Sequence, residues 1–560
     1  MRLNVLDKLF CLFFLFGFYS ANCQQRLAPD IYIVKFTDKN CNSFTTSNPS
    51  AFLSQRAIER RSKQRIQIDL TDLPVSKVYT DSLTQAGFTI QNTSKWINAV
   101  TIVESDTSKL KILNQFSFIN HQFKETSTVQ KKFLQKNKFS ETYQTVSLSD
   151  TGRYGGGYSQ IAIHNGNILQ DKGFSGKGML IAVLDGGFNN VKNYTSLQKL
   201  WLEKRVLLTR DFVDKTRSTF YDLAHGSQVL SVMAANMPNY FIGTAPDADY
   251  ILLRSENAEY DSQFGSYEYP VEEFNWVAAA ELADSIGADV INSSLGYSLF
   301  DDPTLNHTYA EMNGHTTIVS QGAEMAAAKG LVVVISAGNE GDNSWKYITA
   351  PADADHILTA GGIDIHGKHA YFSSYGPTSD GRIKPDVVAV GYQTFIQSSA
   401  QSFAKSYGTS YSAPIIAGLS ACLWQACPNK TNLEIIDAIK RSSSQYTSPD
   451  TILGYGIPDY AYALYLLNPS LFPSKNEIKI YPNPFVSNFT VELGPMESNV
   501  SKLTCTDLTG KIISELELAT STDSPTYINF SDLSNYPKGL YILRIQSGKQ
   551  LITNKIIKIH

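Results

Sequence analysis

Four apolar runs constrain the fold of this 560-residue chain more than any other feature. They are GMLIAVLD (178–185), YILLRS (250–255), ADVINSSLG (288–296) and GLVVVISAG (330–338). Continuous apolar character is typical of strands buried on both faces, and such strands belong to parallel sheets. Apolar residues recur at helical spacing between the runs, as in residues 274–286. The alternation predicts an α/β domain over residues 151–466, an open parallel sheet with helices on both faces.

Three of these runs lead into polar residues. Asp185 ends the first run, Ser293 and Ser294 lie near the end of the third, and Asn339 directly follows the fourth. Ligands of an open parallel sheet bind outside the carboxyl ends of its strands. We therefore expect these side chains to lie along one edge of the sheet.

Two predicted helix starts carry a histidine and a second serine. His225 opens HGSQVLSVMAA, and Ser410 lies in YGTSYSAPIIAG, where Pro414 is tolerated in a first helical turn. A simple helix cap explains Ser410, and so does a nucleophile held at a helix N-terminus. We expect Gly226 and Gly408 where backbone must approach the site closely.

Together these side chains match the needs of nucleophilic catalysis. A serine hydroxyl attacks only when a base within hydrogen-bond reach takes its proton, and imidazole suits that task. A carboxylate such as Asp185 then orients His225, and the Ser410 amide and the Asn339 side chain are natural donors to an oxyanion. Each residue alone has a plainer explanation as a turn or a cap. Their combination in the order Asp, His, Asn, Ser favours a catalytic site.

The motifs IAVLDGG, HGSQVLSVMAA, INSSLG, VVVISAGNEG and GTSYSAPIIAG resemble, in this order, those of the subtilisin-like serine proteases, or subtilases. The resemblance covers roughly residues 155–465 and implies a serine endopeptidase that acts through an acyl-enzyme. It implies a triad of Asp185, His225 and Ser410, with Asn339 as oxyanion donor. It also implies that the segment Ser293, Ser294, Leu295 and Gly296 binds substrate, its backbone pairing as an added strand.

The chain departs from the usual subtilase motifs at a few positions. Gly186 and Ser227 follow the aspartate and the His-Gly pair where Ser or Thr, and Thr, are common, and Tyr411-Ser412 replaces Met-Ala. None of these changes removes a catalytic atom. We expect Tyr411 and Gly187 to alter the shape of the substrate pocket.

No cofactor is required for this chemistry. Subtilases often bind calcium, so a structural calcium is compatible with the resemblance, but the sequence assigns no site to it. The acidic pairs Asp301-Asp302 and Glu272-Glu273 are interpreted as solvated charges.

The first 23 residues have the pattern of a signal peptide. A basic start precedes a short apolar core at 9–19, and Ala21-Asn22-Cys23 fits a cleavage site before Gln24. The core is shorter than the roughly 20 residues that span a bilayer. A lipoprotein site at Cys23 is the alternative, although the preceding residues lack the usual aliphatic residue.

Residues 24–150 are predicted to form a small α+β domain followed by a polar connector. DIYIVKF and WINAVTIVE have strand composition, and residues 49–64 and 78–88 have helical spacing. The run FLSQRAIERR resembles the propeptides of exported bacterial subtilases. The resemblance implies a zymogen whose propeptide assists folding and blocks the cleft until it is cleaved.

Residues 476–560 contain short alternating segments separated by turns, which predict an antiparallel β-sandwich. IYPNPF, DLTGKII and YPKGLYILRI resemble the sorting domain of the type IX secretion machinery of certain Gram-negative bacteria. That resemblance implies export across both membranes to the cell surface or the medium. An immunoglobulin-like binding module is the alternative.

Other function classes fit the sequence less well. A net charge of −4 gives no reason to expect a nucleic-acid partner, and no later run is long enough for a transmembrane segment. An α/β-hydrolase would need a second glycine after Ser410, and a serine-carboxyl peptidase would need Glu at His225. An inactive surface-binding protein on a subtilase scaffold is the remaining alternative. The expected partners are protein or peptide substrates, the chain's own propeptide and the secretion machinery, and we expect a monomer.

Removal of the signal peptide would leave four cysteines, Cys41, Cys422, Cys427 and Cys505. Cys422 and Cys427 are close enough in sequence to form a disulfide in an oxidising compartment, although most buried cysteines simply pack. The sequence leaves this point open.

Overall fold

The computed structural model describes residues 25–120, 144–145, 152–220, 223–257, 267–486, 488–530 and 533–559. The predicted signal peptide and most of the predicted connector lie outside these residues. The chain forms two compact units, Met1–Thr45 with Leu70–Lys131 and Thr46–Asp69 with Lys132–His560. The segment Thr46–Asp69 therefore belongs with the large central domain, although it lies within the predicted propeptide.

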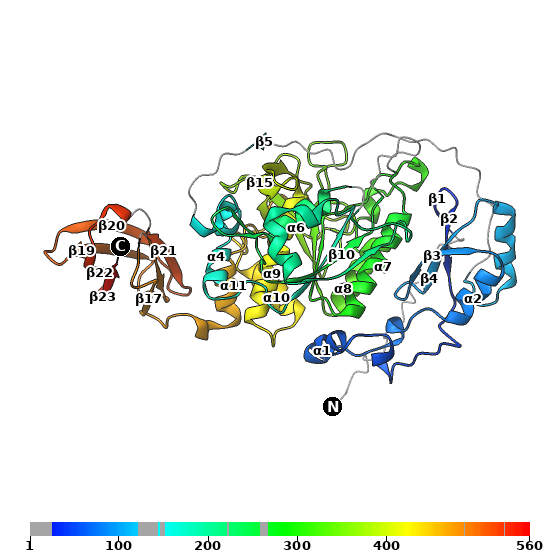
Figure 1. Ribbon diagram of the computed structural model, residues 1–560, viewed down its shortest axis with the longest axis horizontal. Helices are drawn as coiled ribbons and strands as arrows, with labels where there is room; N and C mark the ends of the chain where they lie inside the picture. The colour runs from blue at the N-terminus through cyan, green and yellow to red at the C-terminus, as the bar shows by residue number, and fades with distance from the viewer. Residues whose placement is uncertain are drawn as a thin grey trace, which may run out of the picture. The chain divides into compact units, whose positions relative to one another are not determined.

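A seven-stranded, all-parallel sheet forms the centre of the large unit (Figure 1). Its strands, in spatial order, are β14 (Val387–Val390), β13 (Leu358–Ile363), β12 (Val332–Ser336), β11 (Val290–Ser293), β6 (Leu180–Asp185), β10 (Asp249–Arg254) and β7 (Val206–Asp211). The four apolar runs are β6, β10, β11 and β12, which confirms the predicted parallel sheet. After β6, the chain first adds β7 and β10 on one side of it and then β11, β12, β13 and β14 on the other side. The strand β6 therefore lies at the switch point where such sheets bind ligands.

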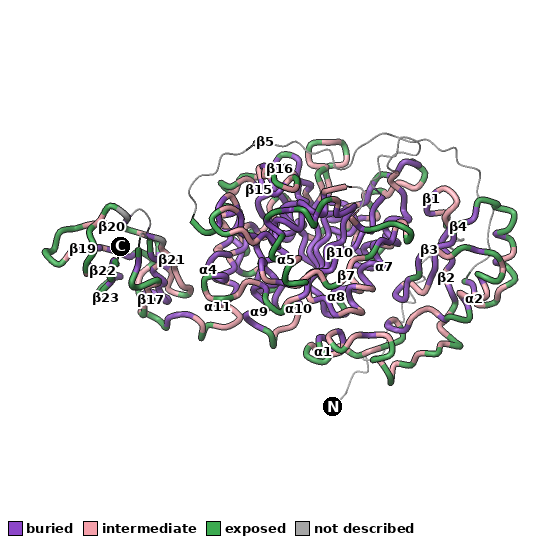
Figure 2. The backbone as a smooth tube through the Cα atoms, viewed as in Figure 1, coloured by how far each residue is buried: buried purple, intermediate pink, exposed green. Residues whose placement is uncertain are grey.

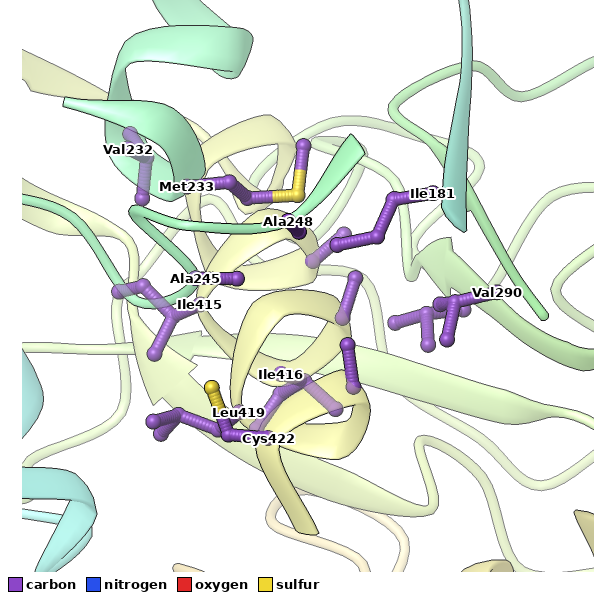
Figure 3. Close-up of a cluster of buried hydrophobic side chains, with 14 of the residues drawn as sticks. Ile181, Val232, Met233, Ala245, Ala248, Val290, Ile415, Ile416, Leu419 and Cys422 are labelled. Carbon is purple, nitrogen blue, oxygen red and sulfur yellow. The ribbon is translucent and has the colours of Figure 1, made fainter. Parts of the chain in front are cut away.

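Helices cover both faces of this sheet. The helices α6 (His225–Ala234) and α9 (Thr409–Ala426) pack together on the face to which Ile181 and Val290 point (Figure 3). On the other face, α7 (Val271–Ile286) packs against α8 (Ile318–Ala328). The strands between them are buried almost completely, apart from the edge strand β7, which is mostly half-buried or exposed (Figure 2). Burial on both faces explains why these strands lack polar alternation.

Shorter elements complete the large unit. They are α1 (Gln55–Gln64), β5 (Gln144–Thr145), α3 (Tyr158–Ala162), α4 (Gly166–Asp171), α5 (Gln198–Leu202), β8 (Asn236–Met237), β9 (Phe241–Ile242), α10 (Asn432–Arg441) and α11 (Tyr460–Leu467). The antiparallel pair β15 (Tyr392–Gln397) and β16 (Phe403–Tyr407) leads directly into α9. Within the described residues, no helix combines the length and apolar character needed to cross a membrane.

The N-terminal unit is the predicted small α+β domain. The strands β1 (Arg26–Ala28), β2 (Ile31–Lys35), β4 (Ala99–Val103) and β3 (Thr89–Ser94) form an antiparallel sheet in that order. The helix α2 (Lys77–Gln85) contributes Tyr79 and Leu83 to a core that includes Val34 and Ile102.

The C-terminal region is an antiparallel sandwich, as predicted. One sheet contains β17 (Ile478–Tyr481), β18 (Phe489–Leu493) and β21 (Thr526–Phe530), and the other contains β20 (Ile512–Ala519), β19 (Val500–Asp507), β22 (Gly539–Ser547) and β23 (Gln550–Lys558). Side chains of both sheets share one core, for example Val491 from the first and Leu503 and Leu543 from the second.

Candidate active site

The fold brings the predicted polar residues to the carboxyl edge of the sheet. Asp185 is the last residue of β6, Ser293 is the last residue of β11, and Asn339 lies in the loop after β12. His225 is the first residue of α6, and Ser410 is the second residue of α9. Because Asp185 shares its strand face with Ile181 and Val183, it points toward the helix layer that contains α6 and α9.

Asp185 and His225 form a buried hydrogen-bonded pair. Nδ1 of His225 lies 2.8 Å from Oδ1 of Asp185, and the two residues are 4% and 0% exposed. The same carboxylate oxygen accepts the amide hydrogen of Gly186 at 2.7 Å. A carboxylate in this position keeps the proton on Nδ1 and leaves the other ring nitrogen to serve as a base.

Gly226 allows this pair to form. A β-carbon at Gly226 would lie 2.5 Å from the carbonyl oxygen of Gly187 and 3.0 Å from Cβ of Asp185. Any side chain would therefore push the start of α6 away from the strand. The expected close approach at Gly226 is confirmed.

Ser410 lies in the first turn of α9 and is 8% exposed. Its Oγ lies 3.5 Å from the carbonyl oxygen of Ser294, and Oγ of Ser294 donates to the carbonyl oxygen of Ser410 at 2.8 Å. The strand end of β11 and the start of α9 therefore hold each other in place.

Tyr411, which follows Ser410 in α9, contacts two residues of α6. Its ring centroid lies 6.1 Å from that of His225, and its hydroxyl donates to Oε1 of Gln228 in α6 at 2.8 Å. Tyr411 is 1% exposed, so it packs between the two helices. The expected effect of Tyr411 on the shape of the substrate pocket stays a prediction; in the structure its ring lies between α6 and α9, next to His225.

Asn339 is exposed, and the start of α9 fixes its orientation. Oδ1 of Asn339 accepts hydrogen bonds from the amide of Thr409 at 2.9 Å and from its hydroxyl at 3.0 Å. The amide nitrogen Nδ2 is thereby turned away from Thr409, and it remains available as a donor. Helix α9 begins after Gly408, whose φ of 141° is a conformation that favours glycine. The φ angle, and not a lack of space, explains why residue 408 is a glycine. A β-carbon there would lie 3.6 Å from Nδ2 of Asn339, which is an ordinary van der Waals contact.

The predicted substrate segment is only partly accessible. Oγ of Ser293 accepts the indole hydrogen of Trp276 in α7 at 2.9 Å, so this side chain faces away from α9. Ser294 and Leu295 are buried at 4% and 1% exposed, and Gly296 is half-buried. Regular pairing resumes at Tyr297, which exchanges two backbone hydrogen bonds with Ala350. The residues that remain for a backbone partner are therefore Ser294 to Gly296.

Two residues near the site were missed by the sequence analysis. Thr409 orients Asn339, and Gln228 holds Tyr411 against His225. Both lie inside motifs that were read only for their catalytic members. The helical spacing of Gln228 after His225 was the one available signal, because it places both residues on the same side of α6.

The interpretation of the acidic pairs as solvated charges is wrong. Glu272 and Glu273 are 0% and 1% exposed, and Asp301 and Asp302 are each 8% exposed. Glu272 accepts the amide hydrogens of Asn257 and Tyr269 at 2.7 and 3.0 Å, in the first turn of α7. A carboxylate is favoured there by the free amide groups and the dipole of the helix.

Glu272 also belongs to the one group of potential metal ligands found among the described residues, with Glu256 and Glu268. The ligand oxygens of the three carboxylates lie within 4.8 Å of one another. Both oxygens of Glu272 accept backbone hydrogens, and Glu256 accepts the hydroxyl of Tyr297 at 2.8 Å. Two of the three carboxylates are thus engaged by hydrogen bonds within the protein, and we assign no metal to the group.

Cys422 and Cys427 do not form a disulfide, and both are buried thiols. The thiol of Cys422 donates to the carbonyl oxygen of Thr244 at 3.2 Å. Burial raises the pKa of Cys427 to about 11. Both cysteines therefore act as packing residues.

Comparisons with known proteins give three family matches. The model of the subtilase family matches residues 176–456, half of the chain. The model of the peptidase S8 propeptide domain of Bacteroidota matches residues 31–142, and that of the secretion system C-terminal sorting domain matches residues 479–559.

Individual relatives are serine proteases. The thermophilic serine proteinase of Bacillus sp. strain AK1 is 30% identical over 287 residues, which are 51% of this chain and 61% of the relative. The chain thus spans less than two thirds of this relative. Serine protease AprX of Bacillus subtilis is 26% identical over 366 residues, 61% of this chain and 75% of the relative.

Among solved structures, MycP1 from Mycobacterium smegmatis is 22% identical, with a TM-score of 0.42 over 57% of this chain and 89% of that one. The family assignment rests on the sequence matches. The chain belongs to the subtilase family, with a propeptide domain before its subtilase domain and a C-terminal secretion sorting domain after it.

Proposed function

We propose that this chain is an exported serine endopeptidase with Asp185, His225 and Ser410 as its catalytic triad. The observation that carries the proposal is the buried Asp185–His225 pair, in which Nδ1 of His225 lies 2.8 Å from Oδ1 of Asp185. Ser410 lies in the first turn of α9, which packs against the helix that begins at His225. In an imidazole held this way, the nitrogen beside the carboxylate keeps its proton, so the other ring nitrogen is the one that acts as the base. The family membership supports the same assignment.

The reaction starts with attack by Oγ of Ser410 on the carbonyl carbon of the scissile peptide bond. His225 takes the hydroxyl proton and then donates it to the leaving amine, while Asp185 stabilises the imidazolium. The acyl-enzyme that remains is hydrolysed by water through the same steps, with His225 again acting as base and then as acid. No step requires a metal or a cofactor.

Two donors would stabilise the oxyanion. The amide of Ser410 lies in the first turn of α9, where helix amides lack intrahelical partners. Nδ2 of Asn339 is the second donor, because Thr409 already occupies Oδ1. Fixed donors of this kind stabilise charge that develops only in the transition state.

Substrate backbone would pair with residues 294–296. This stretch follows β11 and precedes the Tyr297–Ala350 pair, so an extended peptide can add to it as a strand. Main-chain pairing would hold the scissile bond above Ser410, because Ser294 and Ser410 are directly hydrogen-bonded.

The oxyanion assignment gives a graded test of this function. We expect the matured Asn339→Ala variant to cleave a denatured protein at the same bonds as the parent, with kcat lower by about 10²–10³ and KM little changed; this magnitude is the one known for the equivalent asparagine of subtilisin, a family member. Kinetics on a fluorogenic peptide, with the products of the protein substrate identified by mass spectrometry, provide the measurement. Asp342→Ala is the matched control, since Asp342 is exposed in the same loop. An unchanged kcat in Asn339→Ala would remove this residue from the oxyanion site.

The two flanking domains complete the proposal. The N-terminal domain would act as a propeptide that the enzyme itself releases. The C-terminal sandwich would direct export through the type IX machinery of a Gram-negative bacterium. The matches to a propeptide domain and to a secretion sorting domain support these roles.

Deletion of residues 476–560 tests the role of the sandwich. The sandwich has its own hydrophobic core, so we expect its removal to leave the subtilase domain folded. Active enzyme should then accumulate in the periplasm of the native host instead of the medium. Activity assays on fractionated cells provide the measurement, and continued activity in the medium at the parental level would contradict the sorting role.

A further inference from the structure

The segment Thr46–Asp69, which we call the arm, leaves the N-terminal unit and packs against the subtilase domain. Its two ends return to the same place, because Lys39 of the N-terminal unit donates to the carbonyl oxygens of Leu70 and Leu73 at 2.8 and 2.6 Å. The arm is thus a segment inserted between two parts of the N-terminal unit, and helix α1 lies at its centre.

The arm caps the C-terminal end of α7. The last carbonyl groups of a helix lack intrahelical partners. Here the amide and hydroxyl of Ser54 donate to the carbonyl oxygens of Ser285 and Ile286 at 2.9 and 2.6 Å. Nε of Arg56 donates to the carbonyl oxygen of Gly287 at 2.8 Å. The arm therefore satisfies three successive carbonyl groups that α7 cannot satisfy itself.

A buried ion pair lies beside these hydrogen bonds. Asp284 of α7 accepts from Nη2 of Arg60 at 2.6 Å and from Nη2 of Arg61 at 2.7 Å. The side chains of Asp284, Arg60 and Arg61 are 0%, 3% and 1% exposed. Arg60 and Arg61 come from the arm, and Asp284 comes from the subtilase domain. The three charges are therefore buried together only while the arm is bound to the subtilase domain. Breaking such a pair by removing one partner is strongly destabilising.

The far end of α1 contacts two further elements. Nε2 of Gln64 donates to the carbonyl oxygen of Gly330 at 2.8 Å, and its Oε1 accepts the amide hydrogen of Asn432, the first residue of α10, at 2.9 Å. The contact surface thus joins the end of α7, the turn before β12 and the start of α10. It lies where β11 and β12 begin, whereas the candidate active site lies where these strands end.

From these contacts we infer that the arm is a docking segment, which keeps the N-terminal region bound to the subtilase domain after the connector is cleaved. The docking surface is the end of α7 with Gly330 and Asn432, and its partner is the chain's own residues 46–69. Only the natural cleavage event rests on the proposed function. The contacts that hold the arm are separate from the triad, so retention of the N-terminal region does not require occupation of the active site.

The test uses the full chain with Ser410→Ala, so that nothing depends on self-cleavage. A recognition sequence for a site-specific protease is inserted into the connector between residues 125 and 143. The chain is cut, and size-exclusion chromatography over a dilution series measures how much N-terminal fragment co-elutes. We expect the fragment to co-elute with the subtilase domain. Arg60→Gln/Arg61→Gln should raise its dissociation constant by about 100-fold or more, the scale expected when a buried charge loses its partner.

Matched variants separate charge compensation from general damage. Lys63→Gln changes an exposed residue of the same helix and should leave retention unchanged. Asp284→Asn should weaken retention from the opposite side. Added to Arg60→Gln/Arg61→Gln, it should recover part of the loss, because no uncompensated buried charge remains. Circular dichroism of the uncut chains checks folding. If the double variant fails that check, Asp284→Asn carries the comparison.

Two results would overturn the inference. The first is separation of the fragment from the parent chain on cutting. The second is co-elution of Arg60→Gln/Arg61→Gln over the same dilution range as the parent, which would place retention elsewhere in the N-terminal region. Because the measurement needs no peptidase activity, either failure leaves the proposed function standing. Loss of activity in the Asn339→Ala comparison equally leaves the docking result unaffected.

Discussion

The Ser410→Ala variant is expected to lose peptide hydrolysis and to keep its N-terminal region covalently attached. Without Oγ of Ser410 no acyl-enzyme forms, although the Asp185–His225 pair and the oxyanion donors remain in place. In subtilisin, a family member, loss of the catalytic serine lowers kcat by about 2 × 10⁶-fold, and we adopt that value as the expected scale. The measurements are hydrolysis of a fluorogenic peptide and the mass of the purified chain.

Ser412→Ala provides the matched control for this variant. Ser412 lies two residues further along α9, is fully buried and donates to the carbonyl oxygen of Ala389 at 3.1 Å. Its loss should cost about 1 kcal/mol of stability and leave maturation intact. A matured, active Ser410→Ala protein would exclude Ser410 as the nucleophile. Equal binding of a partner by the parent and Ser410→Ala, with no hydrolysis by either, would favour the inactive surface-binding alternative.

The central sheet and the position of the site were predictable because local sequence carries the information. A strand buried on both faces has to be apolar throughout, and β6, β10, β11 and β12 show that pattern. The carboxyl ends of parallel strands meet at one edge, so the residues that follow them meet there too. For this reason the sequence alone predicts that Asp185 and Asn339 lie at this edge.

Tertiary contacts determined what the sequence could not predict. Glu272 and Glu273 are adjacent charges, which usually indicate a solvated face. In the fold, backbone amides bind Glu272, and His307 with the amide of Val319 binds Glu273. His307 is 34 residues away from Glu273, so no local sequence pattern predicts their contact. Burial of a carboxylate becomes acceptable only once such partners are in place.

The arm shows the same limitation over a longer distance. Arg60 and Arg61 belong to the motif FLSQRAIERR, which was interpreted only as a mark of a propeptide. Their partner Asp284 lies more than 220 residues later in the chain. Separate units can be recognised from composition, but which unit buries a given helix face depends on the surface it meets.

Asp185→Asn is the second variant with a large expected effect. Asp185 is fully buried, and Oδ1 accepts both Nδ1 of His225 and the amide of Gly186. Asparagine has nearly the same shape, so the fold should persist, but its amide group no longer stabilises the imidazolium and favours the wrong tautomer of His225. We expect kcat to fall by about 10⁴-fold, the scale known for this substitution in serine proteases, with little change in KM. Steady-state kinetics of the matured variant provide the measurement.

Glu273→Gln is the matched control for Asp185→Asn. It also replaces a buried carboxylate hydrogen-bonded to a histidine, His307, but the residue belongs to the first turn of α7, on the face of the sheet opposite α6 and α9. The free energy of unfolding should decrease, whereas kcat should stay within about threefold of the parent, because no proton of the reaction passes through this pair. If the two substitutions lowered kcat equally, the loss would reflect general damage to the fold. If Asp185→Asn kept kcat within tenfold of the parent, Asp185 would not be the residue that orients His225, and the triad would have to be assigned again.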